Sequence, residues 1–138
     1  MSPWKPPNFK QKERRLPAGK GCAANVQPGE TPPNCIACPF AKDGLPFNKP
    51  VRPEVPVTRP RGVLVGEGPG HDEHALGQPF VGMTGDELNH QLAQNGLARN
   101  KLLIVNAMGC MPPPGMRTEA NMRAAATACR PWMLSSIK

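Results

Sequence analysis

Prolines are packed into the first half of this 138-residue chain. Thirteen of the 19 prolines fall within residues 1–60. Each proline fixes φ and removes a backbone donor, so neither a long helix nor a central strand can form among them. The sequence therefore predicts loop and extended chain up to about residue 60, and a folded core built mainly from the second half of the chain.

The excess positive charge lies in the same half as the prolines. Residues 1–62 carry 11 Lys and Arg against four acidic residues, while residues 63–138 carry six of each sign, so the first part holds the whole net charge of +7. A basic, extended segment suits a polyanion such as DNA, because each neutralised phosphate releases counterions. A solvated tail that only aids solubility explains the same composition.

The chain shows no signal for export or membrane insertion. No apolar run approaches the roughly 18 residues of a membrane span, and the N-terminus "MSPWKPPNFK" has no apolar signal core. We therefore expect a cytoplasmic protein. Five cysteines in such a chain favour metal or redox chemistry over a disulfide framework.

Two apolar runs predict strands of an α/β fold. "RGVLVGEGPG" breaks into a glycine-rich turn, and "KLLIVNAMGC" repeats the pattern of an apolar strand that leads into a loop. Between them, Thr84 and Glu87 form a capping-box pattern that predicts a helix to about Asn95, ended by Gly96. Two strands joined through a helix form a parallel pair with a right-handed connection.

A second helix is predicted from "TEANMRAAATAC", which opens at Thr118 and Glu119. Pro131 is expected to interrupt it, and "PWMLSSIK" then begins a further helix. A two-stranded parallel sheet is too small to bury both of its faces. We therefore expect more structure after residue 138, or a covering from outside the chain.

Four of the five cysteines form a candidate ligand set. Cys35 and Cys38 make a CxxC, Cys110 comes after the second strand, and Cys129 lies in the second helix. Four thiolates suit either structural zinc or an iron–sulfur cluster. The 19 positions between Cys110 and Cys129 fit poorly with the close pairs of a zinc ribbon. Cys22 is left over and is interpreted as a free thiol.

The turn "GEGPG" at residues 66–70 comes directly after the first strand. It lacks the GxGxxG spacing of dinucleotide-binding folds, since position 71 is His. The glycines alone would make a tight turn, but Glu67 stands at the carboxyl end of a strand, where open α/β sheets bind ligands. We therefore interpret this turn as part of a binding site.

Together these motifs resemble one family. "VLVGEGPGHDEHALGQPFVGMTGDEL" and "GLARNKLLIVNAMGCMPPPGMRTE", with "CIACPF" before and "ACRPW" after, resemble the family 4 iron–sulfur uracil-DNA glycosylases. The resemblance implies a three-layer α/β/α fold with a parallel central sheet, here truncated. It covers roughly residues 35–138, so the expected organisation is a basic, proline-rich segment at 1–34 and a glycosylase-like domain at 35–138.

The resemblance also implies site residues. Glu67 and Gly68 would line the uracil pocket and place the water, Phe80 would stack on the flipped base, and Asn106 would read the uracil edge. These types suit the task, because a base lifted from the stack is held by stacking and by hydrogen bonds to its edge. Without the motif context, Phe80 also suits a core position and Asn106 a loop cap. The family's [4Fe–4S] cluster would be held by Cys35, Cys38, Cys110 and Cys129.

The chain departs from the family in three respects. Where the family usually reads KCRPPxNR, this chain has Gly109, Met111 and Met116, which we expect to remove polar groups from the rim of the site. The last two cysteines stand farther apart than usual, so the loop between them should bulge or the cluster geometry should adapt. The family's His-Pro-Ser motif, whose histidine stabilises the departing uracil, is absent; it is matched by none of His71, His74 and His90.

The expected function is that of the N-terminal part of a uracil-DNA glycosylase that hydrolyses the N-glycosidic bond of deoxyuridine in DNA. Alone, these 138 residues are expected to excise uracil poorly or not at all. The alternative is a non-catalytic iron–sulfur module, derived from the same family, that binds DNA or another partner. A zinc-bound structural domain is a third hypothesis.

Overall fold

The computed structural model describes residues 26–41 and 50–137. Most of the basic segment and Cys22 therefore lie outside the described residues. The described elements are, in chain order, the 3-10 turns η2 (Cys35–Ala37) and η3 (Pro39–Ala41), strand β1 (Gly62–Gly66), helices α1 (His71–Leu76) and α2 (Met83–Gln94), turn η4 (Arg99–Lys101), strand β2 (Leu102–Asn106) and helix α3 (Glu119–Ile137).

β1 and β2 form a two-stranded parallel sheet, which confirms the predicted pair. The register runs from Gly62 beside Leu102 to Gly66 beside Asn106. The other edge of β2 is also paired, because Glu54 forms an antiparallel bridge with Ile104. The Glu54 N–H donates to the Ile104 carbonyl with an N to O distance of 2.9 Å, and the Ile104 N–H donates to the Glu54 carbonyl at 3.0 Å. The segment before β1, predicted to be extended chain, therefore adds a short third backbone contact to the sheet.

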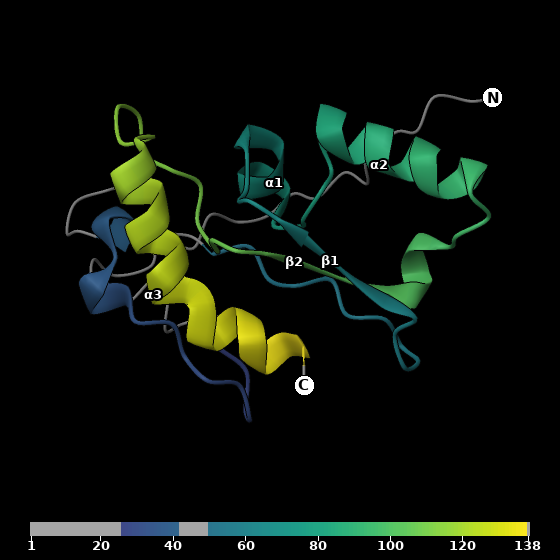
Figure 1. Cartoon of the computed structure of the whole chain (residues 1–138), viewed down its shortest axis with the longest axis horizontal. Helices are drawn as coiled ribbons and strands as arrows, with labels where there is room; N and C mark the ends of the chain where they lie inside the picture. The colour runs from purple at the N-terminus through teal and green to yellow at the C-terminus, as the bar shows by residue number, and fades with distance from the viewer. Residues whose placement is uncertain (1–25, 42–49, 138) are drawn as a thin grey trace.

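Helices pack on both faces of the sheet. Leu64 and Ile104 point to one face and contact Leu88 and Leu92 of α2, as the spacing of these two leucines predicts. On the other face α3 packs against β2, whose four leading residues are all buried. Figure 1 shows α2 and α3 on different sides of the strands. This arrangement confirms the predicted α/β architecture with a parallel central sheet.

One strip of the sheet stays uncovered by the described residues. Val63 and Val65 of β1 are 40% and 55% exposed, although they share a face with buried residues of β2. The expectation that two strands are too few to bury both faces is therefore met at β1. None of the helices in the described ranges combines the length and the apolar character needed to cross a bilayer.

The ends of α2 were predicted only in part. The helix begins at Met83 with Gly82 as N-cap, so the capping box assigned to Thr84 is wrong. A side chain would not fit at this N-cap position, because a Cβ on Gly82 would lie 2.8 Å from Oδ2 of Asp72. The helix ends before Gly96, whose φ of +67° is the left-handed geometry that glycine adopts readily, as predicted.

Helix α3 runs through Pro131, so the expected interruption is wrong. Its predicted start is confirmed, since the Thr118 hydroxyl accepts a hydrogen bond from the Asn121 N–H at 3.2 Å. Proline costs the helix one backbone bond. Trp132, the next residue, is only 4% exposed, and the burial of its large side chain stabilises the part of the helix that follows Pro131.

Glu30 ties the segment before the CxxC to the rest of the fold. Its carboxylate accepts two bonds from the Arg52 guanidinium, at 3.1 and 2.7 Å, and one from the Trp132 indole N–H at 3.0 Å. The backbone N–H of Gln27 donates a further bond at 2.8 Å. The bond from Arg52 is the main reason that the pKa of Glu30 falls to about 2, against the opposing effect of burial. The predicted boundary at residue 34 stays a prediction.

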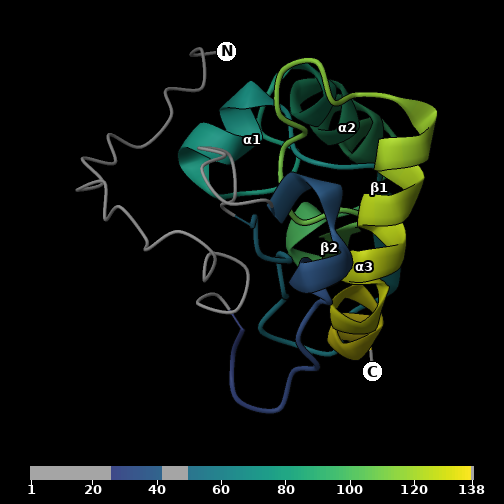
Figure 2. The same cartoon turned by 90° about the vertical axis from the view of Figure 1, so that its left-hand side faces the viewer.

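The two views agree on the neighbours of α3. The turns η2 and η3, which carry the CxxC, lie beside it in Figures 1 and 2. The Asn34 N–H also donates to the Ala128 carbonyl at 2.8 Å. The proline-rich region is thus irregular in backbone but attached to α3 at defined points.

The Glu30 contacts predict a measurable effect of pH on stability. We expect Glu30→Gln to lower the free energy of unfolding at neutral pH by about 1–3 kcal/mol, because charged hydrogen bonds are replaced by neutral ones. The folded pKa lies below the ordinary value, so this contribution is complete above about pH 4.5 and is lost as the pH falls toward 2.

Urea unfolding of both proteins between pH 7 and pH 3 provides the measurement. The difference between them should shrink as the pH falls. Glu119→Gln serves as the matched control, because Glu119 pairs only with the exposed Arg123 across one turn of α3. A difference that stayed constant with pH would contradict the role of the Glu30 charge.

Candidate functional site

The carboxyl ends of β1 and β2 meet at one edge of the sheet. Glu67 and Gly68 come directly after β1, and Asn106 is the last residue of β2, paired with Gly66. The ladder continues past the strands, because the Met108 N–H donates to the Glu67 carbonyl at 3.0 Å. The structure therefore brings three of the predicted site residues to one place.

An aromatic ring and an amide meet over Gly66. A Cβ placed on Gly66 would lie 2.6 Å from Cζ and 2.8 Å from Cε2 of Phe80, and would also collide with Oδ1 of Asn106. Both side chains thus approach the same point above the strand. Phe80 packs at the same time against Leu64 and Leu88, so its ring is half-buried and fixed on one side by the core.

The backbone at Phe80 is strained. Its φ is +50°, and it is the one residue other than glycine with a positive φ in the described ranges. This conformation costs a side-chain-bearing residue on the order of 1–3 kcal/mol. Its carbonyl points at Gly85 of α2, where a Cβ would overlap the Phe80 carbonyl group. Glycine is thus needed at position 85 because the Phe80 carbonyl lies against the helix there, and not because the backbone turns.

Arg99 holds this strained backbone. Its guanidinium donates to the Phe80 carbonyl at 2.8 Å and to the Pro79 carbonyl at 2.7 Å. The same group donates to Oδ1 of Asn89 at 2.9 Å and, through Nε, to the Glu54 carboxylate at 2.9 Å. Four bonds from one side chain therefore join the loop, α2 and the segment before β1.

The Glu67 carboxylate is accessible. It pairs with Arg117 at 3.0 Å, and both side chains are about two-thirds exposed, at 66% and 67%. An ion pair this exposed contributes little stability. The carboxylate is therefore available to a water molecule or a substrate at this edge.

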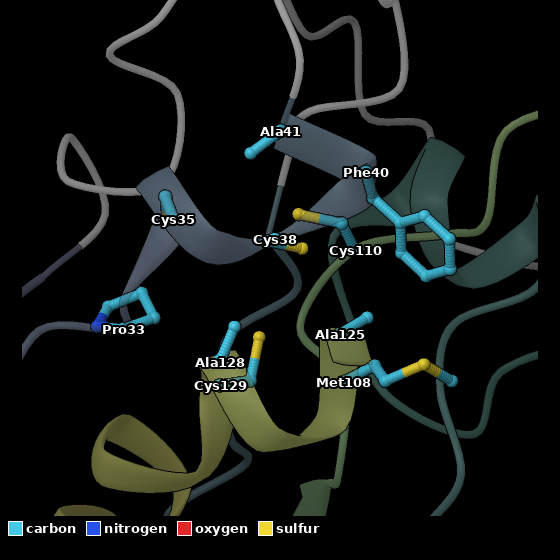
Figure 3. Close-up of a pocket in the computed structure, with 10 residues that line it drawn as sticks. All are labelled: Pro33, Cys35, Cys38, Phe40, Ala41, Met108, Cys110, Ala125, Ala128 and Cys129. Atoms are coloured by element: carbon cyan, nitrogen blue, oxygen red, sulfur yellow. The ribbon is translucent and has the colours of Figure 1, made fainter. Parts of the chain in front are cut away.

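A second site lies between α3 and the CxxC turns. All four predicted cysteine ligands line one small, mainly apolar cavity. Figure 3 shows Cys38, Cys110 and Cys129 turned toward this space. The separation between the last two cysteines consists of the loop at residues 111–118, with a turn at Gly115, and the first part of α3.

The apolar surroundings of this cavity disfavour a thiolate that has no bound metal. Burial raises the pKa of the Cys129 thiol, and nearby Cys38 acts in the same direction, while a bond from the Gly109 N–H opposes them. That N–H lies 3.5 Å from the Cys129 sulfur. A metal centre would supply the positive charge that stabilises thiolates in such apolar surroundings.

The cysteines do not form a single-ion site as they stand. In the described ranges, no three Cys, His, Asp or Glu side chains are close enough to share one metal ion. Cys35 is disulfide-bonded in the structure, whereas Cys38, Cys110 and Cys129 are buried thiols. A four-thiolate site therefore requires Cys35 in its reduced form.

Two of the residues expected at the rim lie in the interior instead. Gly109 and Met111 are both buried, and a Cβ on Gly109 would lie 2.7 Å from Cζ3 of Trp132. Met116 packs against the cluster of buried side chains around Met108. The prediction that these departures strip polar groups from the rim is wrong for Gly109 and Met111, because their positions face the core.

Met108 joins the two sites. It is 1% exposed and lines the cysteine cavity, while a Cβ on Gly68 would lie 2.8 Å from its Cε. Sequence reasoning missed both Met108 and Arg99. No local pattern marks them, since their roles depend on contacts with residues distant in the chain.

The comparisons with known proteins address the family. The model of the uracil DNA glycosylase superfamily matches residues 53–138. The chain belongs to this superfamily. The matched region contains β1, β2, all three α-helices and every predicted site residue outside the CxxC.

Individual uracil-DNA glycosylases are also similar to the chain. It is 32% identical to the type-4 uracil-DNA glycosylase of Pyrobaculum aerophilum over 107 residues, which cover 75% of this chain and 50% of that protein. The type-4 enzyme of Thermotoga maritima is 37% identical over 76 residues, covering 55% and 38%. That of Archaeoglobus fulgidus is 49% identical over 51 residues, covering 37% and 26%. The chain spans about half the length of the first of these relatives and less of the others.

The crowding at Gly66 predicts that even one methyl group disrupts the site. We expect Gly66→Ala to displace the Phe80 ring or the Asn106 amide, and to lower stability by about 1–3 kcal/mol through overpacking. Ring-labelled phenylalanine NMR and thermal unfolding provide the measurements.

Gly62→Ala is the matched control in the same strand. Its Cβ would meet only Cδ2 of Leu102 at 3.4 Å, an ordinary contact. Equal effects of the two substitutions would contradict the proposed crowding at Gly66.

Proposed function

We propose that this chain recognises uracil in DNA and forms part of a uracil-DNA glycosylase that hydrolyses the N-glycosidic bond of deoxyuridine. The observation that carries the proposal is the meeting of the Phe80 ring and the Asn106 amide over Gly66. Membership of the superfamily and the type-4 relatives support it.

Each group has a distinct part in holding the base. A flipped base loses its stacking partners, at a cost of a few kcal/mol. Stacking on an aromatic ring returns about 1–3 kcal/mol, and Phe80 offers its ring for this. The Asn106 amide can donate to O4 and accept from N3–H of uracil, whereas cytosine presents the reversed pattern. Discrimination then rests on a fixed orientation of the amide.

The cleavage step requires a water and a stabilised leaving group. Water oxygen bonds to C1′ of the sugar, the C1′–N1 bond breaks, and its electron pair leaves with uracil. The exposed Glu67 carboxylate can orient this water and accept its proton, while Gly68 leaves space beside it. The charge on uracil needs a donor, and the sequence contains no His-Pro-Ser motif to provide one.

We also propose that Cys35, Cys38, Cys110 and Cys129 hold a [4Fe–4S] cluster. Four cysteine thiolates are the usual ligands of such a cluster, and each binds a different iron, so the sulfurs need not converge on one point. The four residues line one apolar cavity, which supports this assignment. When bound, the cluster would hold the CxxC turns, the loop after β2 and α3 together.

The basic region at residues 1–62 is proposed to contact DNA phosphates, because it carries the whole net charge of +7. Residues 1–25 and 42–49 of this region lie outside the described residues. A cytoplasmic location also stays a prediction from the sequence.

The cluster proposal predicts coloured protein. Anaerobically purified protein should be brown, with broad visible absorbance and about four irons and four sulfides per chain. Cys110→Ser should remove most of the colour, because it deletes a buried ligand, whereas the control Cys22→Ser should leave it unchanged. Colourless protein with one zinc per chain would contradict the proposal.

The recognition proposal predicts selective binding. The protein should bind a single-stranded oligonucleotide with one deoxyuridine more tightly than the same strand with deoxycytidine. Phe80→Leu should weaken binding to the deoxyuridine strand by about tenfold or more, because stacking is lost. Fluorescence anisotropy measures both affinities, and Val57→Ala is the control, because Val57 is a fully exposed apolar side chain.

Uracil release from the same oligonucleotide separates recognition from cleavage. We expect it to be slow, since a missing oxyanion donor typically costs roughly a hundredfold to a thousandfold in rate. Equal affinity for the two strands would overturn the proposed function.

A further inference from the structure

Arg99 stands apart from the basic residues expected to contact DNA. Its side chain is 22% exposed, and its guanidinium donates four hydrogen bonds of 2.7–2.9 Å to protein acceptors. A guanidinium carries five N–H donors, so almost all of its capacity is used within the fold. It therefore has little left to offer a phosphate.

The anchor of Arg99 is the sheet itself. Glu54, which accepts the Nε bond, is fixed by two backbone bonds to Ile104 in the middle of β2. From this fixed carboxylate the guanidinium reaches outward to the carbonyls of Pro79 and Phe80. The contacts thus run in sequence from the sheet through Glu54 and Arg99 to the loop.

The loop needs such an anchor. Phe80 has a φ of +50°, a conformation that a residue with a side chain rarely adopts unless its surroundings impose it. Its carbonyl is held between Arg99 and Gly85, and its ring lies against Gly66. If the carbonyl were released, the backbone could relax and the ring would leave its place beside Asn106.

We propose that Arg99 is a positioning residue for uracil recognition, which holds the strained Pro79–Phe80 backbone so that the Phe80 ring stays beside Asn106. This inference rests on the proposed function of Phe80 as the stacking residue. Arg99 itself touches neither base nor phosphate in this scheme. Glu54 supports it by fixing the guanidinium.

The test uses Arg99→Lys, which keeps the charge but cannot bridge four acceptors in different directions. In the 138-residue protein with ring-labelled phenylalanine, the Phe80 signal, assigned with Phe80→Leu, should shift and broaden. Affinity for the deoxyuridine strand should fall about tenfold. In Arg99→Gln, which removes the charge, the dependence of affinity on salt should stay that of the wild type, because no phosphate contact is lost.

Two further variants serve as a milder change at the same contact and as a control. Glu54→Gln is the milder change, and it should move the Phe80 signal in the same direction by a smaller amount. Arg123→Gln is the matched control, because Arg123 pairs with Glu119 on the exposed surface of α3, where the side chains are 77% and 86% exposed. It should alter neither the Phe80 signal nor the preference for deoxyuridine.

The possible failures are distinguishable. A Phe80 signal unmoved in both Arg99→Lys and Glu54→Gln would overturn the role of Arg99. A flatter salt dependence in Arg99→Gln would overturn it too, because it would identify a phosphate contact. Wild-type protein that binds the deoxyuridine and deoxycytidine strands equally would overturn the proposed function instead. The ring signal is read without DNA, so it reports on Arg99 in either case.

Discussion

The parallel register of β1 and β2 puts Gly66 directly beside Asn106, and the arrangement of the base site depends on that pairing. Because Gly66 has no side chain, the Phe80 ring and the Asn106 amide can approach the same point above the strand. The ladder continues past both strands through Met108, which fixes the path of the Glu67–Gly68 turn. A change of register by one residue would separate these groups and turn their side chains to the opposite face.

Two partly buried arginines fix irregular segments of the backbone, one around Glu30 and the other at residues 79–80. Arg52 joins Glu30 and thereby Trp132, and Arg99 joins Glu54 to the backbone of the 79–80 loop. In both cases the carboxylate is itself fixed by another part of the fold. Such bidentate or multiply bonded guanidinium contacts give more geometric precision than exposed ion pairs of the Glu67–Arg117 type.

The parts of the fold that could be predicted from the sequence were those with a local or periodic cause. The apolar runs indicated a parallel pair, Leu88 and Leu92 marked the buried face of α2, and Gly96 marked its end. The Thr84 cap was wrong because the helix begins one residue earlier, at Met83, after Gly82, which packs closely against Asp72 of a separate helix. Pro131 is tolerated because the burial of Trp132 outweighs one lost backbone bond.

In the candidate site, too, some residues could be predicted from local motifs and others depend on contacts between distant parts of the chain. Motif resemblance placed Phe80 and Asn106 in one pocket, and the structure brings them together, while their roles stay predictions. Arg99 could not be found from the sequence, since its partners lie 10 to 45 positions away and their spacing has no period. The cysteine cavity was predicted as a set of ligands, but its disulfide-bonded Cys35 was not.

Met108 has a consequence for how mutants of this protein should be interpreted. One face of this buried side chain lines the cysteine cavity, and the other contacts the backbone at Gly68. Thioethers adapt to irregular spaces, which suits a position that has to satisfy two neighbours at once. A substitution at position 108 would therefore disturb the cysteine cavity and the Gly68 backbone together, so weaker base binding in such a mutant would not mean that Met108 touches the base.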